Sequence, residues 1–394
     1  MKKIILLLNI TLTTSLGFAQ CDPTTINDIP TVYTKEYSAS YKPTPEQEKY
    51  MATIFTSVIE PALKSTKGLK GSWQPMGEFK ATPEGLTPSD IEMYMPVMGC
   101  SKDKKIYTKH ESGLVINFTL NDFAVLLKSE IATVCIQDQD TYIKAKDTYQ
   151  KKIIYFKTDG NQIYRLQAQT VSEKYNSYAF YRQTDDGKYF VITKPGAPIF
   201  IPVTIKQALE VNKKNTEMYI ANFQEHLKSP SLLPETRAAY EKKNPKDIEA
   251  LKSLPDPEKQ INEIYKFSEE TKKGAALNDQ KMIEFLTTSL TIINNYLKIT
   301  SGKDLEKPAY NGALISIPFQ TKEELKDYLS DYYSKNGLCV ILNPAYFNRT
   351  ASKTAPQFIC IELRGQTNDA VTVKAFTSFE EALDFKKLQS LLVK

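Results

Sequence analysis

The sequence predicts an α+β fold: an antiparallel sheet with packed helices, then a helical connector and a smaller C-terminal α/β part. Apolar residues recur at helical spacing over 44–68, alternate with a period of two through much of 72–202, and return to helical spacing after 204. Hydrophobic residues form 41% and charged residues 25% of the 394 residues, a globular composition. We expect a signal peptide over 1–19, an α+β domain over 20–228, a helical connector over 229–300 and a C-terminal α/β domain over 301–394.

The first helix is marked by a capping box of Thr44 with Gln47 and by Pro45 in its first turn. Its buried face comprises Met51, Ile54, Phe55, Val58, Ile59 and Leu63. Gly68 and Gly71 end the helix.

The following segment, 72–202, has the alternation of half-buried strands. Asp159-Gly160 and Asp186-Gly187 suit tight hairpin turns, because glycine tolerates positive φ. We expect a short helix to interrupt the sheet at about 122–131.

A second capping box, Thr204 with Gln207, begins a helix that we expect to reach about Lys228. Prolines then divide 229–300 into short charged pieces, and each proline is tolerated near a helix start. Apolar residues over 282–297 predict one longer helix in this connector.

The C-terminal part predicts strands at 313–317, 338–342, 357–363 and 371–376. Thr321 with Glu324 caps a helix through Tyr333, and Ser378 with Glu381 opens the last helix. Two arrangements satisfy this pattern: a second compact domain, or completion of the first sheet.

The N-terminus predicts export. Lys2 and Lys3 precede an apolar stretch, and Gly17-Phe18-Ala19 places small residues at a cleavage site before Gln20, as in bacterial signal peptides. A membrane anchor needs about 20 strongly apolar residues, and this stretch is shorter and interrupted by polar residues. A lipid anchor on Cys21 is the second alternative to a cleaved signal peptide. We expect a periplasmic or extracellular protein without a membrane span, or one associated with the outer membrane.

Five cysteines leave at least one unpaired within the chain. Cys339 and Cys360 lie in two predicted buried strands, and they are candidates for a disulfide or equally for two buried thiols. Cys100 with Cys135 is a weaker candidate pair.

The scarce residue types exclude several functions. His110 and His226 are the only histidines, and neither lies in a metal or nucleophile motif, so we expect surface structural roles for both and no cofactor or metal. Five arginines and no basic stripe argue against nucleic-acid binding, although the net charge is +5. No phosphate-binding glycine motif is present.

Acidic pairs and tyrosines remain as candidate site residues. Asp185-Asp186 and Asp138 with Asp140 lack the spacing of a calcium loop, and turn geometry explains Asp186-Gly187. Four tyrosines near one predicted hairpin are candidates for ligand contact, with cross-strand packing as the structural alternative: Tyr175, Tyr178, Tyr181 and Tyr189.

Three passages carry a family resemblance. Lys194 to Leu209, with Pro202-Val203-Thr204, and the runs Leu342 to Phe347 and Ala355 to Phe358 resemble segments of uncharacterised secreted proteins of Bacteroidota. The resemblance covers about a tenth of the chain and implies no activity. Such relatives often carry arginine after the threonine, where this chain has Ile205.

We therefore expect an exported protein that binds a protein or carbohydrate ligand, since no catalytic motif is recognisable. The alternative is a carboxylate-dependent hydrolase acting on an envelope or environmental polymer, because paired carboxylates leave no short sequence signature. A structural role in surface assembly or gliding is a third hypothesis.

Overall fold

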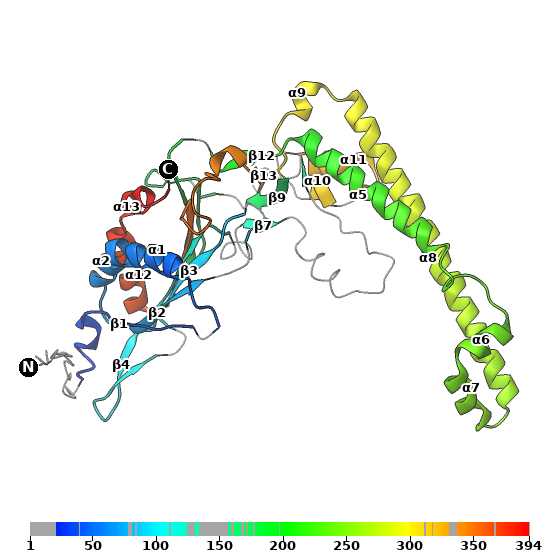
Figure 1. Ribbon diagram of the computed structural model, residues 1–394, viewed down its shortest axis with the longest axis horizontal. Coiled ribbons are helices and arrows are strands. Elements are labelled where there is room, and N and C mark those ends of the chain that lie inside the picture. The colour runs from blue at the N-terminus through cyan, green and yellow to red at the C-terminus, as the bar shows by residue number, and fades with distance from the viewer. Residues whose placement is uncertain are drawn as a thin grey trace, which may run out of the picture. The chain divides into compact units, whose positions relative to one another are not determined.

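The computed structural model describes residues 21–393, apart from 39, 78–80, 83–84, 110–111, 124–130, 134–156, 159–160, 167–168, 171, 176–177, 197, 311–312, 317, 331–336 and 366–367. The fold is α+β (Figure 1). The chain forms two compact units, each assembled from separate stretches of sequence. Unit 1 comprises Met1–Val125, Gln183–Lys194 and Asn348–Lys394, and unit 2 comprises Leu126–Arg182 and Pro195–Phe347.

Unit 1 is built on a seven-stranded sheet of order β1-β2-β3-β6-β14-β11-β10. β1 pairs parallel to β2. The next four pairs are antiparallel: β2 with β3, β3 with β6, β6 with β14, and β14 with β11. The strands are β1 (Val32–Lys35), β2 (Lys70–Gly77), β3 (Ser89–Met95), β6 (Leu114–Leu120), β10 (Phe180–Gln183), β11 (Gly187–Thr193) and β14 (Phe358–Gly365). A separate hairpin pairs β4 (Met98–Cys100) with β5 (Ile106–Thr108).

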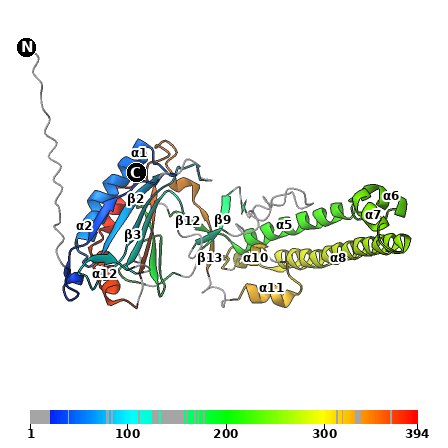
Figure 2. The same cartoon turned by 90° about the horizontal axis from the view of Figure 1, so that it is seen from below.

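Helices cover one face of this sheet, as Figures 1 and 2 show. They are α1 (Pro45–Ile54), the π-helical turn η2 (Phe55–Ile59), α2 (Glu60–Lys64), α12 (Ala370–Ala382) and α13 (Phe385–Ser390). The capping box at Thr44 is confirmed, because its side chain accepts a hydrogen bond from Gln47 N while Gln47 Oε1 accepts one from Thr44 N. Ile91, Phe118 and Ile361 lie in register beneath these helices and are fully buried.

The expected C-terminal domain is divided, because β14 completes the first sheet whereas β13 (Leu338–Leu342) lies in the smaller sheet of unit 2. β14 pairs with β6 on one side and with β11 on the other. Residues 348–394 therefore belong with the N-terminal ones in unit 1, whereas residues 301–347 belong to unit 2.

Two expected strands are helices. Residues 371–376 lie within α12, because the Asp369 side chain accepts hydrogen bonds from the backbone N–H groups of Val371 and Thr372 and so begins a helix there. Ser378 is inside α12 and opens no helix; the cap of α13 is Asp384. Residues 313–316 form α10 (Ala313–Ser316).

Unit 2 contains a smaller sheet of order β12-β13-β9-β7, with β8 also paired to β9. Its strands are β7 (Ile131–Thr133), β8 (Lys157–Thr158), β9 (Asn161–Leu166), β12 (Phe200–Pro202) and β13 (Leu338–Leu342). Its core joins β9 and β13 to α5 (Ile205–His226), α8 (Pro257–Ile299), α9 (Gly302–Leu305), α10 and α11 (Lys322–Tyr328). Thr204 caps α5 and Thr321 caps α11, as the sequence predicts, although α11 ends at Tyr328. The expected short helix at 122–131 falls mostly outside the described residues, and Ile131 begins β7.

The expected connector contains one long helix, α8, which forms a helical hairpin with α5. α5 packs along α8. The two short helices α6 (Arg237–Lys243) and α7 (Pro245–Lys252) contact α8 near its N-terminal end, as Figure 2 shows. Pro245 and Pro257 lie in the first turns of α7 and α8, where proline is tolerated. No proline follows until Pro308, so α8 continues for 43 residues.

Of the two alternatives for Cys339 and Cys360, the disulfide is wrong and the pair of buried thiols is confirmed. Both are free, buried thiols, on β13 of the smaller sheet and β14 of the larger one. Burial raises the pKa of Cys339 to about 12 and raises that of Cys360 as well. Cys100 instead pairs with Cys21, and Cys135, its weaker candidate partner, lies outside the described residues.

Candidate functional site

A cavity of about 210 Å³ lies in unit 1 between the β10–β11 turn, the end of β14 and one side of α12. It is smaller than the cavities that usually hold drug-sized ligands, so its size suits a single amino acid or sugar. The lining residues are Gln183, Thr184, Asp185, Asp186, Gly187, Lys188, Gly365, Thr372, Val373, Phe376, Thr377 and Glu380.

The β10–β11 turn supplies one wall. Thr184 Oγ1 donates to Asp186 Oδ1 at 2.7 Å, and Gly365 N donates to the Asp186 carbonyl at 3.1 Å. The expected reason for glycine in this turn is wrong, because Gly187 has no positive φ. A Cβ there would lie 2.7 Å from the Leu363 carbonyl oxygen, so close packing of β11 on β14 requires glycine.

One face of α12 supplies the opposite wall. Thr372, Phe376 and Glu380 follow at intervals of four residues, which places them on one side of a helix. The Thr372 hydroxyl accepts a hydrogen bond from Gly113 N at 3.0 Å and so fixes the helix to the start of β6.

An ion pair lies inside the cavity. Lys188 Nζ is 2.5 Å from Glu380 Oε2, with 19% and 8% of the two side chains exposed. The same ammonium lies 5.7 Å from the centre of the Phe376 ring, within cation–π range. Lys188 therefore neutralises the most buried carboxylate of the lining.

The lining has an excess of negative charge. Three carboxylates face one ammonium, a net charge of −2 when all four groups are ionised. Asp185 and Asp186 are exposed at the turn and carry the uncompensated charge. Such a cavity favours a cationic ligand over an anionic one. In the described part of the chain, no three His, Cys, Asp or Glu side chains converge as metal ligands would.

The face of the same sheet opposite α1, α2, α12 and α13 carries a row of polar side chains. Gln74, Glu92, Asn117 and Glu362 lie in register on β2, β3, β6 and β14. Asn117 Nδ2 donates to Glu362 Oε2 at 2.8 Å, and Arg364 Nε lies 3.0 Å from Glu362 Oε1. Burial raises the pKa of Glu362, and the negative charges of Asp186 and Glu92 raise it further. The hydrogen bond from Asn117 and the positive charge of Arg364 act in the opposite direction but do not cancel the rise.

The candidate tyrosines do not form an exposed ligand patch. Tyr175 and Tyr181 are buried with ring centroids 4.7 Å apart, and the half-buried Tyr178 stacks on Tyr175 at 5.8 Å. Tyr189 is buried on β11 in unit 1. This burial favours the packing interpretation, since a contact surface needs exposed rings.

The structure places the acidic and histidine candidates in different parts of the chain. Asp185 and Asp186 line the cavity, whereas Asp138, Asp140 and His110 lie outside the described residues. His226 is not a plain surface residue, because its Nδ1 lies 2.5 Å from Asp279 Oδ2 on α8.

The sequence interpretation missed Lys188, Phe376 and Glu380. Assigning 371–376 to a strand separated Phe376 from Glu380, although Asp369 before an apolar run is a helix-start signal. The approach of Lys188 to Glu380 depends on long-range pairing, for which no local signal exists.

Comparisons of the chain with family models, curated proteins and solved structures find no match. Among the described helices, none combines the length and the apolar character that crossing a membrane requires. The function is therefore inferred from the chemistry of the site itself.

Proposed function

We propose that the chain is an exported binding protein whose unit 1 takes a small amine-bearing ligand, such as an amino sugar, in the cavity between the β10–β11 turn and α12. The observation that carries the proposal is the cavity's excess of carboxylates, with its single lysine already committed to Glu380. The ligand ammonium would lie near Asp185 and Asp186, and the apolar part of the ligand would contact Phe376.

Export is part of the proposal. The apolar N-terminal stretch supports it, and so does the Cys21–Cys100 disulfide, because disulfides persist in oxidising compartments. The bond to Cys100 uses the sulfur that a lipid thioether on Cys21 would need, which favours the form without a lipid. Deletion of residues 2–19 should retain the protein in the cytoplasm; an unchanged compartment would contradict export.

The ligand class is tested by calorimetric titration of the exported protein with glucosamine, N-acetylglucosamine and glucose at pH 7 and low salt. We expect glucosamine to bind and the two uncharged sugars to bind much more weakly, with the difference shrinking at high salt. Equal binding of all three sugars, or binding of none, would contradict the cationic-ligand proposal.

A second candidate function is the carboxylate-dependent hydrolase. It is favoured by one observation: burial raises the pKa of Glu362, the direction that a general acid requires, and the exposed Glu92 lies two strands away on the same face of the sheet. An inverting glycosidase would show activity on polysaccharide that Glu362→Gln abolishes. Absence of turnover on a panel of envelope polysaccharides would remove this candidate.

A further inference from the structure

The outward side of α8 carries a regular stripe of exposed residues. The stripe follows alternating steps of four and three, the heptad pattern of a helix that packs along another helix. Phe267 is 70% and Leu277 51% exposed, and a Cβ on Gly274 would meet no atom within 4 Å. The members of the stripe are Glu263, Phe267, Glu270, Gly274, Leu277 and Lys281, all exposed.

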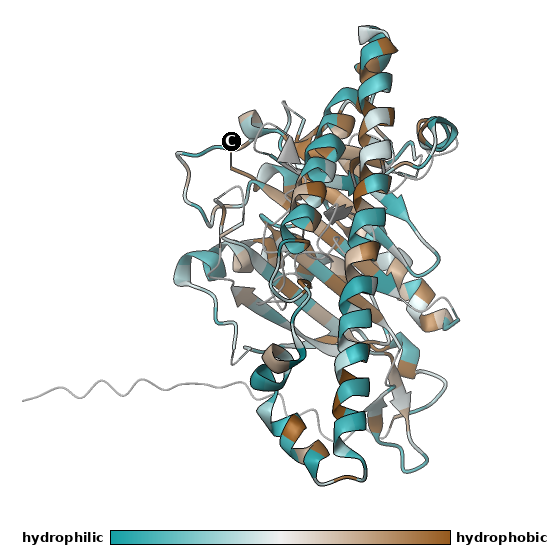
Figure 3. Ribbon diagram, turned by 90° about the vertical axis from the view of Figure 1, so that its right-hand side faces the viewer, coloured by the Kyte–Doolittle hydropathy of each residue, from teal (hydrophilic) through white to brown (hydrophobic). Residues whose placement is uncertain are grey.

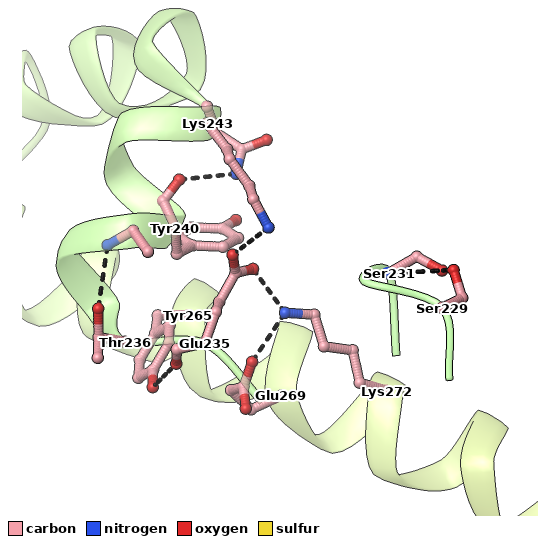
Figure 4. A network of polar contacts seen from close by, with 11 residues as sticks. Ser229, Ser231, Glu235, Thr236, Tyr240, Lys243, Tyr265, Glu269 and Lys272 are labelled. Carbon is pink, nitrogen blue, oxygen red and sulfur yellow. Dashed lines mark hydrogen bonds and ion pairs between the residues drawn. The ribbon is translucent and has the colours of Figure 1, made fainter. Parts of the chain in front are cut away.

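The inward side of α8 already has its partners within unit 2. Lys272 Nζ lies 2.5 Å from Glu235 Oε1 and 2.9 Å from Glu269 Oε1, and Tyr265 OH donates to the Glu235 carbonyl (Figure 4). The hydrogen bonds from Lys243 and Lys272 lower the pKa of Glu235. Ile261 and Leu286 are buried on this side. The stripe is therefore not needed to hold α8 against the helices that it contacts.

Apolar and polar residues alternate along the long helix in Figure 3. Within the described residues, no hydrogen bond or ion pair engages the side chains of Glu263, Glu270 or Lys281. Two large apolar side chains and three charged ones thus lie on this side of α8 without a partner.

The stripe is complementary to itself. Glu263 and Lys281 are equally far from Lys272 along the chain, and so are Phe267 and Leu277. Glu270 and Gly274 form the third such pair. In an antiparallel pair of α8 helices centred on Lys272, each acid at one end meets a lysine at the other, and each phenylalanine meets a leucine. Gly274 leaves room for the partner's Glu270.

We propose that α8 pairs antiparallel with α8 of a second copy of this chain through the Glu263–Lys281 stripe. Charge complementarity selects a second copy, because both ends of the stripe are satisfied only by the same sequence running in the opposite direction. At a rise of 1.5 Å per residue the stripe is about 27 Å long. So short a contact makes a weak dimer, with Kd in the micromolar range.

The test is sedimentation equilibrium of the exported protein between roughly 1 and 100 μM, the range that brackets a weak interface. We expect concentration-dependent dimerisation that Phe267→Gln reduces at least tenfold, while the matched control Ile299→Gln leaves it unchanged. Ile299 is 79% exposed on the same helix but outside the stripe. Helical content by circular dichroism should be equal in both variants, because both positions are exposed.

Charge reversal tests the antiparallel geometry. Glu263→Lys alone and Lys281→Glu alone should each weaken dimerisation by roughly fivefold, because each alters two symmetric ion pairs. The double variant should restore wild-type affinity, since the pairs re-form with exchanged signs. A wild-type protein that stays monomeric to 100 μM, or a double variant as weak as the single ones, would overturn the proposal.

Discussion

The sheet core of unit 1 and the α5–α8 hairpin of unit 2 differ in how many polar side chains they bury. In unit 1, Ile91, Phe118 and Ile361 lie side by side at full burial. The helices α5 and α8 bury apolar residues such as Leu209 and Ile293, but they also bury polar side chains, namely Asn212, Asn215, Thr216, Asn222, Asp279 and Ser289. Over 229–282, the described large apolar side chains that are buried are Ile248 and Ile261.

This difference indicates where the molecule is stable and where it is poised to open. Apolar burial supplies most of the free energy of folding, whereas a buried amide contributes only when its hydrogen bonds are made. Asn212 Nδ2 donates to the Leu314 carbonyl at 3.0 Å, but Asn215 Nδ2 and Asn222 Oδ1 are buried without a hydrogen-bond partner. We infer that the α5–α8 hairpin opens locally before the sheet of unit 1.

The largest effect is expected in the sheet core. Phe118→Ala should lower the free energy of unfolding by about 3–5 kcal/mol, because it leaves a cavity at a fully buried position between β3 and β14. Urea unfolding measures the change. The control Val32→Ala, at an exposed position, should change it by about 0.5 kcal/mol or less. A cost near that of the control would contradict the assignment of the core.

The disulfide ties the N-terminal segment to unit 1 and should have the next largest effect. Cys21→Ser should destabilise unit 1 by about 2–4 kcal/mol, since the bond closes a long loop, with a sequence separation of 79. A reducing agent should destabilise the wild type by a similar amount and leave the variant unaffected. Equal sensitivity of both proteins to reduction would show that this pair is not bonded.

The polar interface should respond in the opposite direction to the core. Asn215→Leu is expected to stabilise the hairpin by about 1 kcal/mol, because it removes a buried amide group without a partner. Asn212→Leu should destabilise it, because the Leu314 carbonyl loses its donor. Hydrogen exchange of α5 amides measures both. Changes of the same sign in the two variants would refute the distinction.

The smallest effect concerns pH and Glu362. Its pKa is raised in the folded protein, chiefly by burial, so the native state holds this proton more tightly than the unfolded chain. Its contribution to stability is present below the unfolded pKa of about 4.3 and is lost as pH rises through the folded pKa. Glu362→Gln should therefore gain stability relative to wild type between pH 4 and pH 7. Parallel pH profiles in urea unfolding would contradict the shift.

Local signals predicted local structure well. The side chains of Thr44, Thr204 and Thr321 cap helices because a capping motif lies within four residues and needs no tertiary partner. The run from Val371 to Phe376 was misassigned because its β-branched residues favour strands, while the Asp369 cap and packing on the sheet favour a helix.

Features that depend on contacts between distant parts of the chain could not be predicted from the sequence. Cys360 has its nearest strand partners at Thr119 and Val191 in the seven-stranded sheet, whereas Cys339 lies on β13 of the smaller sheet. The candidate cavity needs a turn at 184–187 and a helix at 370–382 to meet across β14. Asp185 and Asp186 were identified as an acidic pair, but only the fold brings Glu380 and Lys188 beside them.

The most direct test of the central claim is glucosamine titration of two variants that remove carboxylates inside and outside the cavity. Asp185→Asn with Asp186→Asn removes the uncompensated charge of the cavity, whereas Glu381→Gln removes a carboxylate from the exposed side of α12 outside the lining. We expect the double variant to lose at least tenfold in affinity, about 1.4 kcal/mol, and the Glu381→Gln control to bind like wild type. Equal affinity in all three proteins would contradict binding in this cavity.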